Sequence, residues 1–337
     1  MAERKRFEWK LRTRTLLLGE RPLIVAVLNI TPDSFSDGGK YTDPDRAYAR
    51  ALELQDLGAD IIDIGAESTK PGVARVPEGE ELRRIVPLLK KLDGKLKIPV
   101  SVDTYKSAVA LKAGDYGAEI INDPSGFTWD TALAKTVAKL EMGFILNHMR
   151  GTPESWAKMG PIKDLIVTVR QDLEASISRA LRDGVQKVNV VVDPGIGFGK
   201  RKEQNAELIA HLGAFTSLGV PLLVGPSRKL FLKQESERAT EFATAAAVTA
   251  SILNGAHLVR VHDVEAMKPV VEVAESIFRA GIVIEKDEDE KGPKKSPIAE
   301  PGVNRMHAGA KRPHESLSKR LRPGGGDRPP FRGGRDR

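Results

Sequence analysis

The residues Leu-Ile-Val-Ala-Val-Leu at 23–28 form a short apolar run that ends in the polar residue Asn29. Seven further apolar runs follow along the chain, and each ends in a polar residue or a polar turn. Segments with helical spacing, such as Pro44–Leu57 and Glu78–Leu92, separate the runs. Short β-branched runs that alternate with helices predict a single parallel (β/α)8 barrel, or TIM barrel. The further runs lie at 60–64, 98–102, 118–121, 143–146, 188–192, 221–224 and 256–261.

The polar residues behind the runs indicate where the site lies. In such barrels the loops at the C-terminal ends of the strands carry the chemistry. We therefore expect these residues to meet at one rim of the barrel. They are Asn29, the Glu67-Ser68-Thr69 turn, Asp103, Asn122, Asn147, Asp193, the Ser227-Arg228-Lys229 turn and His262.

The length of the chain leaves room for segments outside the barrel. A barrel of this type takes about 250 residues, and the chain has 337. Alternation in residues 1–22 predicts an N-terminal β-hairpin that closes the bottom of the barrel, and residues 23–285 form the barrel itself. Residues 286–337 are rich in Pro, Gly, Lys and Arg. We expect this basic tail to be disordered, because it cannot bury enough apolar surface.

The net charge of +7 comes from the tail. Residues 291–337 carry 13 Lys and Arg against 4 Asp and Glu, so the rest of the chain is close to neutral. The final Arg-Gly-Gly segments resemble sequences that bind RNA weakly. Two interpretations stay open for the tail: weak nucleic-acid contact, and a solvated segment without a specific partner.

Composition excludes several function classes. The chain has no cysteine, so it has no disulfide, no thiol nucleophile and no cysteine-based zinc site. No apolar run approaches the ~20 residues of a membrane span, and the sequence has no signal-peptide pattern. We therefore expect a cytoplasmic protein without membrane contact.

Two long strand-to-helix loops are candidates for binding loops. Residues 29–39, Asn-Ile-Thr-Pro-Asp-Ser-Phe-Ser-Asp-Gly-Gly, are longer than the two to six residues that such a connection needs. Their oxygen donors suit Mg²⁺ and phosphate, although an Asp/Gly turn also explains the glycines. In the second loop, residues 63–72, Asp63 is expected to be a structural acid inside a strand, and Glu67 to brace a neighbouring strand.

Carboxylates and amides are expected to share the pocket. Asp103 and Asp193 both end strands, and Asn122 and Asn147 end neighbouring ones. A single such Asp is usually a helix cap, but four groups at one rim can bind the donor and acceptor edge of a heterocycle.

The last three loops predict an apolar wall and an anion site. Residues 195–200, Gly-Ile-Gly-Phe-Gly-Lys, match neither the dinucleotide fingerprint nor the P-loop. Phe198 instead offers an apolar wall to a flat ligand. Barrel phosphate sites often follow strands seven and eight, where Arg228, Lys229, Arg260 and His262 lie. Alternation places Arg260 and His262 on one side of their strand. His211 and His257 are expected to be structural.

Seven of these motifs in order resemble the dihydropteroate synthase family, over roughly residues 23–280. They are Asn29–Gly39, Gly65–Gly72, Ser101–Thr104, Ile121–Asp123, Asp193–Lys200, Ser227–Lys229 and Arg260–Asp263. The resemblance implies condensation of 6-hydroxymethyl-7,8-dihydropterin pyrophosphate with 4-aminobenzoate, which gives 7,8-dihydropteroate and pyrophosphate in folate biosynthesis. It also implies Mg²⁺ as cofactor, inhibition by sulfonamides and a homodimer.

The resemblance also implies roles for individual residues. The catalytic residues would be Asp103, Lys229 and Asn29, with Asn29 as the metal ligand. Pyrophosphate would be held by Asn29, Arg260 and His262. The pterin would be bound by Asp103, Asn122, Asn147, Asp193, Phe198, Gly225, Lys229 and Arg260. Aminobenzoate would be bound by Thr69, Lys70, Pro71, Phe198 and Ser227. The lid would consist of Thr31, Pro32, Asp33, Ser34, Phe35, Ser36 and Asp37.

Three positions depart from the family pattern, and two other functions stay open. Lys70 replaces the usual Arg, Asn147 replaces a residue that is commonly Met, and Pro124 replaces a branched aliphatic residue. The first alternative is a pterin-dependent methyltransferase, which would not need the pyrophosphate ligands. The second is a non-catalytic pterin-binding protein with an RNA-binding tail. For the reaction itself we favour C–O cleavage before the arylamine attacks, with Asp103 as a fixed carboxylate beside the developing cation.

Overall fold

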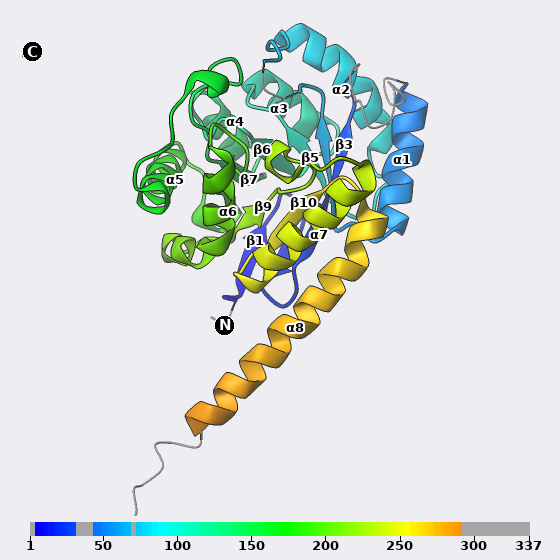
Figure 1. Cartoon of the computed structure of the whole chain (residues 1–337). Coiled ribbons are helices and arrows are strands. Elements are labelled where there is room, and N and C mark those ends of the chain that lie inside the picture. Colours follow the sequence, from blue (N-terminus) through cyan, green and yellow to red (C-terminus); the bar gives the residue numbers. More distant parts are fainter. Residues whose placement is uncertain (1–3, 32–42, 69–71, 291–337) are drawn as a thin grey trace, which may run out of the picture. The chain divides into compact units, whose positions relative to one another are not determined.

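The computed structural model describes residues 4–31, 43–68 and 72–290, and shows strands alternating with helices around a barrel (Figure 1). The strands are β1 Phe7–Lys10, β2 Thr15–Leu18, β3 Leu23–Asn29, β4 Ile61–Gly65, β5 Val100–Asp103, β6 Ile120–Asp123, β7 Gly143–Asn147, β8 Val190–Asp193, β9 Leu223–Val224 and β10 Leu258–Val261. The α-helices are α1 Pro44–Asp56, α2 Glu78–Leu92, α3 Ser107–Asp115, α4 Leu133–Lys139, α5 Leu165–Arg182, α6 Lys202–Ala210, α7 Glu237–Leu253 and α8 Val264–Glu290. The 3₁₀ helices are η1 Trp156–Lys158, η2 Lys187–Asn189, η3 Leu212–Leu218 and η4 Leu230–Leu232.

The barrel strands are all parallel, in the order β8-β7-β6-β5-β4-β3-β10-β9. A parallel bridge between Val192 and Leu222 joins the two ends of this order. The predicted (β/α)8 barrel is therefore confirmed, and each predicted run overlaps one of its strands. The run at 221–224 gives the shortest strand, β9, because Pro221 has no N–H to donate.

The helix boundaries follow local chemistry. Asp43 caps α1, where its carboxylate accepts from the backbone N–H of Asp45 and Pro44 occupies the first helical position. Asp263 accepts from the N–H of Ala266 at the start of α8. Gly58 follows α1 with φ of +99°, a conformation that favours glycine.

Helix α8 continues to Glu290, beyond the boundary expected at residue 285. Residues 291–337 lie outside the described part, so their disorder stays a prediction.

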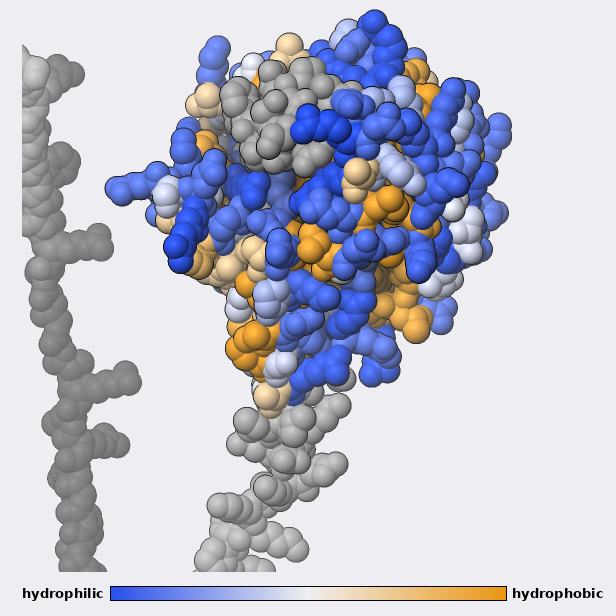
Figure 2. Space-filling model, turned by 90° about the vertical axis from the view of Figure 1, so that its right-hand side faces the viewer, coloured by the Kyte–Doolittle hydropathy of each residue, from blue (hydrophilic) through white to orange (hydrophobic). Residues whose placement is uncertain are grey.

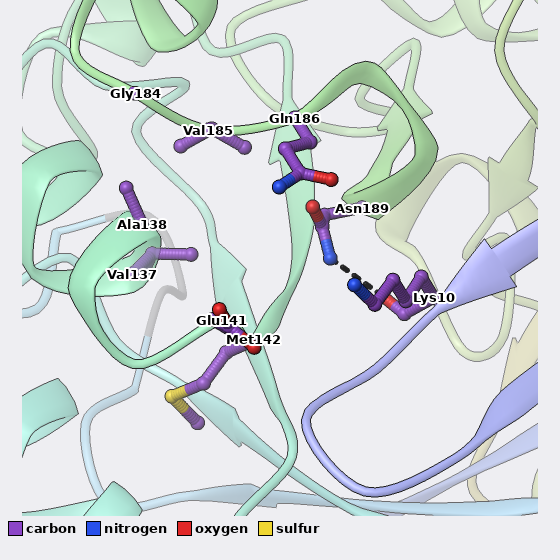
Figure 3. Close-up of a pocket in the computed structure, with 9 residues that line it drawn as sticks. All are labelled: Lys10, Val137, Ala138, Glu141, Met142, Gly184, Val185, Gln186 and Asn189. Atoms are coloured by element: carbon purple, nitrogen blue, oxygen red, sulfur yellow. Dashed lines mark hydrogen bonds between the residues drawn. The ribbon is translucent and has the colours of Figure 1, made fainter.

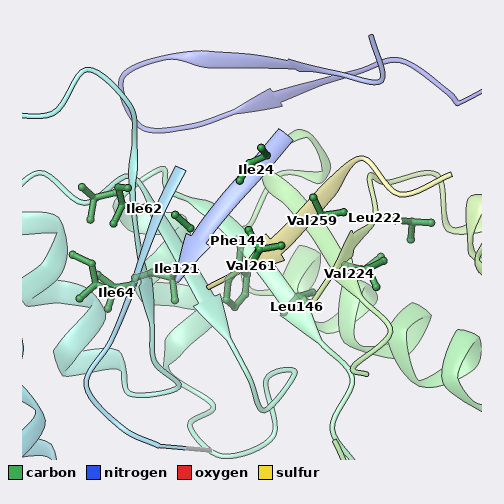
Figure 4. Packing of buried hydrophobic residues seen from close by; sticks show 14 of the residues in the cluster. Ile24, Ile62, Ile64, Ile121, Phe144, Leu146, Leu222, Val224, Val259 and Val261 are labelled. Atoms are coloured by element: carbon green, nitrogen blue, oxygen red, sulfur yellow. The ribbon is translucent and has the colours of Figure 1, made fainter. Parts of the chain in front are cut away.

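Each barrel strand has two buried faces. One face packs against the helices and includes Ile24, Ile62, Phe144 and Val259 (Figure 4). The opposite face lines the barrel, and its apolar members lie toward the strands' N-terminal ends, as Val25, Ile61, Ile120, Ile145, Val191, Leu223 and Leu258 do. Further along the same faces come the polar residues of the rim. The barrel interior is thus apolar at the bottom and polar at the top.

The N-terminal hairpin closes the apolar end of the barrel. Strands β1 and β2 pair antiparallel, and Trp9, Leu11 and Leu18 pack against the apolar interior. The indole Nε1 of Trp9 donates to the carbonyl of Asn189 at 2.7 Å. The hairpin expected over residues 1–22 is confirmed for its described part, and so is its position at the barrel bottom.

A small cavity lies at this same end, away from the strand C-termini (Figure 3). Its volume is ≈ 40 Å³, and Asn189 Nδ2 donates to the Lys10 carbonyl at its edge. It is lined by Lys10, Val137, Ala138, Glu141, Met142, Gly184, Val185, Gln186 and Asn189. Within the described residues, no helix is both long and apolar enough to span a membrane.

Candidate active site at the C-terminal rim of the barrel

The strand pairing aligns four strand ends on one side of the rim. Asn29 at the end of β3 pairs in register with Gly65 of β4, and Gly65 pairs with Asp103 of β5. Asp103 in turn pairs with Asn122 of β6. Gly65 is important here, because a Cβ at this position would lie 3.2 Å from Asn29 Oδ1 and 3.7 Å from Asp103 Cβ. The absent side chain therefore keeps Asn29 and Asp103 close neighbours.

Arg260 of β10 links carboxylates from two other strands. Its Nε donates to Asp63 Oδ2 at 2.6 Å, and its Nη2 donates to Asp103 Oδ2 at 2.9 Å. Asn122 Nδ2 also donates to Asp63 Oδ2, at 3.0 Å. Burial alone would lower the pKa of Arg260, but Asp63 and Asp103 raise it above its ordinary value. The guanidinium is therefore a fixed positive charge across the barrel mouth.

Asp103 is a carboxyl group with a raised pKa. Burial raises its pKa from the ordinary 3.8 to about 7, Arg260 opposes the rise, and Asp63 adds to it. A carboxyl with such a pKa in a cleft is a candidate for function.

Asp193 and Asn147 form the opposite side of the rim. They pair in register on β8 and β7, and Asp193 Oδ1 accepts from the Gly195 N–H at 2.7 Å. Burial raises the pKa of Asp193 to about 6. Asn147 Nδ2 donates to the Pro124 carbonyl at 2.8 Å, whereas its buried Oδ1 has no hydrogen-bond partner within the described residues.

Lys229 lies above the ring of Phe198. The distance from its Nζ to the ring centroid is 4.0 Å, which is a cation–π contact. Burial and the nearby Arg260 lower the pKa of Lys229 to about 8. Gly225, at the end of β9, leaves space between Arg260 and Asp193: a Cβ there would lie 3.5 Å from Arg260 Cβ.

The loops after β9 and β10 bring Ser227 and His262 together. The hydroxyl of Ser227 lies 2.9 Å from His262 Nδ1, and it also accepts from the His262 N–H at 3.3 Å. Arg228, which the sequence placed in the anion site, forms an ion pair with Glu241 of α7 instead. Its positive φ of 55° belongs to this turn.

Some predicted residues lie outside the described part of the chain. These are Thr69, Lys70 and Pro71 of the aminobenzoate set, and Pro32, Asp33, Ser34, Phe35, Ser36 and Asp37 of the lid. Thr31 is described and is buried.

Glu67 forms an ion pair with Lys106, which also pairs with Glu81 of α2. Glu67 is thus tied to the N-cap residue of α3, and not to a residue of a neighbouring strand.

Asp63 was expected to be a structural acid inside a strand, and the structure confirms this: it is fully buried and accepts from both Arg260 and Asn122. An acid inside an apolar run, on the same strand face as Ile61, was the available signal. No role was predicted for Lys200 or for His148, which are hydrogen-bonded to each other beyond the ends of β8 and β7. Among the described residues, no three His, Asp or Glu side chains gather as a metal site.

Comparison with known proteins agrees with this geometry. Residues 25–262 match the family described as "Pterin binding enzyme". The dihydropteroate synthase of Synechocystis sp. is 41% identical over 265 residues, which cover 77% of this chain and 92% of that protein. The enzyme of Clostridium beijerinckii is 41% identical over 274 residues, which cover 80% of this chain and 99% of that protein.

Solved structures give the same result. The Yersinia pestis dihydropteroate synthase in complex with a sulfonamide drug superimposes with a TM-score of 0.77 and 35% identity, over 80% of this chain and 99% of that one. The Xanthomonas albilineans enzyme with 4-aminobenzoic acid gives a TM-score of 0.74 and 36% identity, over 81% and 98%.

The barrel and its polar rim thus define a transferase of the pterin-binding class. Within that class, the chain belongs to the dihydropteroate synthase family, whose members act in folate biosynthesis.

Proposed function

We propose that this chain joins 6-hydroxymethyl-7,8-dihydropterin pyrophosphate to 4-aminobenzoate, with Mg²⁺ bound, to give 7,8-dihydropteroate and pyrophosphate. The observation that carries the proposal is the Arg260 bridge between Asp63 and Asp103, with Asn29 beside Asp103. This arrangement places a permanent cation and a carboxylate next to each other, which suits a substrate that separates into a diphosphate anion and a methylene cation.

The pterin is proposed to bind between the two sides of the rim. Asp193 accepts two parallel N–H bonds from the amino-pyrimidine edge, as a carboxylate can. Asn122, held by Asp63, presents its amide oxygen to the same ring. Lys229 and Phe198 contribute a donor and a flat apolar face. Asn147 offers the unpartnered oxygen described above.

The diphosphate is proposed to lie near Asn29, Arg260 and His262. Mg²⁺ usually keeps several waters and is bound through substrate phosphates plus one or two protein oxygens. A single amide oxygen such as Asn29 Oδ1 fits that donor set, and no larger cluster is required. When bound, Mg²⁺ stabilises the charge of the departing diphosphate. Arg260 supplies a second positive charge, and His262, hydrogen-bonded to Ser227, is fixed in orientation.

The reaction is proposed to be dissociative. The bond between the pterin methylene carbon and the bridging oxygen breaks, and its electron pair leaves with the diphosphate. Asp103 stabilises the resulting cation as a carboxylate, while Arg260 keeps that carboxylate in place. The neutral arylamine nitrogen then bonds to the methylene carbon and loses a proton. Ser227 and Phe198 are proposed to contact the arylamine, with residues 69–71, and sulfonamides would compete there.

Isotope effects test this mechanism. With deuterium on the reacting methylene, a dissociative step gives a normal secondary isotope effect on kcat/KM clearly above unity. Asp103→Asn is expected to lower kcat by roughly 10²–10³, as the loss of a group that stabilises transition-state charge does, while pterin binding is retained. An isotope effect near unity would contradict the dissociative order. Unchanged turnover in the variant would contradict the role of Asp103.

Pyrophosphate release on mixing both substrates with Mg²⁺ tests the function itself. A pterin-dependent methyltransferase or a non-catalytic pterin-binding protein would release none. A separate measurement tests the proposed weak nucleic-acid contact of the tail: RNA binding by the full chain is compared with RNA binding by a chain that lacks residues 286–337. The cytoplasmic location likewise stays a proposal.

A homodimer through α7 and α8 is also proposed. The two helices pack together, and their outer faces expose Phe242 (64%), Val273 (59%) and Ile277 (48%). Hydrophobic areas also lie between hydrophilic ones on the surface shown in Figure 2. Phe242→Asp is expected to shift sedimentation from dimer to monomer. Leu111→Asp on α3, also at an exposed apolar residue, is the matched control and should leave the dimer intact.

A further inference from the structure

Lys200 is a partly buried lysine that the proposed mechanism does not use, and burial lowers its pKa to about 7. Its Nζ donates to the carbonyls of Gly195 at 2.8 Å and Phe198 at 3.2 Å, both in its own loop between β8 and α6. It also donates to the carbonyl of His148 at 3.1 Å and to the His148 ring nitrogen Nδ1 at 2.9 Å. All four partners are acceptors, so the site is shaped for the three donors of an ammonium group.

The loop backbone is folded around this ammonium. Gly195 and Gly197 have φ of +75° and +83°, a region that side chains rarely allow. A Cβ on Gly195 would lie 1.9 Å from the His148 carbonyl oxygen. The loop therefore runs directly against the end of β7. The Nζ of Lys200 donates to two carbonyl groups of this loop, those of Gly195 and Phe198.

His148 is itself held from the other side. Its Nε2 lies 3.0 Å from Asp172 Oδ2 on α5, and the ring is buried. Burial and the neighbouring Lys200 lower the pKa of His148 to about 4, so the imidazole is neutral. With Asp172 accepting from Nε2–H, Nδ1 is the free acceptor that Lys200 needs. A single chain of hydrogen bonds thus connects an exposed carboxylate to the loop.

The loop presents Phe198 to the pterin site. Lys200 fixes the backbone carbonyl of Phe198, Lys229 lies over its ring, and Trp156 contacts the ring edge at a centroid distance of 5.6 Å. A Cβ on Gly197 would lie 3.0 Å from Lys229 Cδ. A shift of the loop would therefore move both Phe198 and Lys229.

We propose that Lys200, oriented by His148 and Asp172, is a positioning residue that holds Phe198 and Lys229 in place for the pterin substrate. The proposal rests on the proposed pterin site. Lys200 itself touches no reacting atom. Its loss should therefore weaken pterin binding and raise the KM for the pterin substrate, while kcat at saturation changes little.

Direct binding separates this role from a merely structural one. The probe is 6-hydroxymethylpterin, titrated calorimetrically into the full chain. Lys200→Met keeps the length of the side chain and removes its donors, so we expect a Kd about tenfold higher. Lys200→Gln retains two donors and should recover part of the affinity. Lys202→Met, at an exposed lysine at the start of α6, is the matched control and should leave the Kd unchanged.

A milder variant keeps the test valid if Lys200→Met fails to fold. Asp172 is exposed (59% for its side chain), and Asp172→Ala removes the hydrogen-bond partner of His148 without disturbing the core. We expect a Kd about two- to threefold higher, since a hydrogen bond contributes modestly. Folded Lys200 and Asp172 variants with wild-type pterin affinity would overturn the positioning role. Absence of pterin binding by the wild-type chain would instead refute the proposed function.

Discussion

Arg260 Nε lies 2.6 Å from the carboxylate of Asp63, a residue that the barrel buries completely. This contact anchors a guanidinium that also reaches Asp103. The anchor comes from β4 and the guanidinium from β10, so the pair ties strands on both sides of β3.

Removing this anchor should destabilise the fold. Asp63→Ala leaves Arg260 and Asn122 without their shared acceptor, and breaking a buried pair costs about 3–5 kcal/mol. Urea unfolding of the variant measures the cost. Arg21→Ala breaks the more exposed Arg21–Asp60 pair and should cost about 0–1 kcal/mol. Equal effects of the two substitutions would show that Asp63 is not an anchor.

The pH dependence of stability should report on Asp103. Its pKa is raised from 3.8 to about 7 in the folded protein, so between these values the folded state binds a proton that the unfolded chain has released. This group therefore lowers stability as the pH rises toward 7. Asp103→Asn should gain about 1–3 kcal/mol relative to wild type on going from about pH 5 to about pH 8. A constant difference between the two unfolding free energies would refute the raised pKa.

Two glycines at the site should respond differently to alanine. At Gly225 an added Cβ meets Arg260 and Asp193 at ordinary contact distances of 3.5 and 3.9 Å. Gly225→Ala should therefore fold normally and weaken only pterin binding. At Gly195 the Cβ would collide with a backbone carbonyl at a positive φ. Gly195→Ala should cost about 2 kcal/mol or more in unfolding free energy. Thermal unfolding together with pterin titration checks both outcomes.

The hairpin at the barrel bottom should matter for stability and not for chemistry. Trp9 is fully buried, and Trp9→Ala should cost about 3–5 kcal/mol. The KM values should stay at wild-type levels below the melting temperature, because the hairpin and the rim lie at opposite ends of the strands. A changed KM for either substrate would contradict that separation.

The fold was predictable because hydrophobic periodicity, and the residues that begin and end helices and strands, are local properties of the sequence. The residues of each strand, the caps at Asp43 and Asp263 and the plugging hairpin all follow from short stretches of sequence. The partners of Arg260 are not local. Whether it meets an anion, Asp63 or Asp103 depends on strand register and barrel closure, which link residues nearly 200 positions apart.

Contacts between residues far apart in the sequence also explain why the roles of some loop residues were not predicted correctly. Arg228 and Lys229 are adjacent in sequence, yet one pairs with Glu241 on α7 and the other lies over Phe198. A turn with positive φ at Arg228 separates them, and no sequence period marks such a turn. Lys200 ends a glycine-rich loop that matches no phosphate-binding motif, and its Nζ faces carbonyl groups of the protein that lie on two separate segments.

The closed bottom of the barrel also determines the route by which molecules can reach its interior. Because Trp9, Leu11 and Leu18 seal that end, every molecule that enters or leaves the interior must use the opposite mouth. In a reaction with two substrates, the one bound deeper has to arrive first, and its later partner blocks its escape. For the two substrates proposed above, the closed bottom of the barrel therefore predicts ordered binding through a single opening.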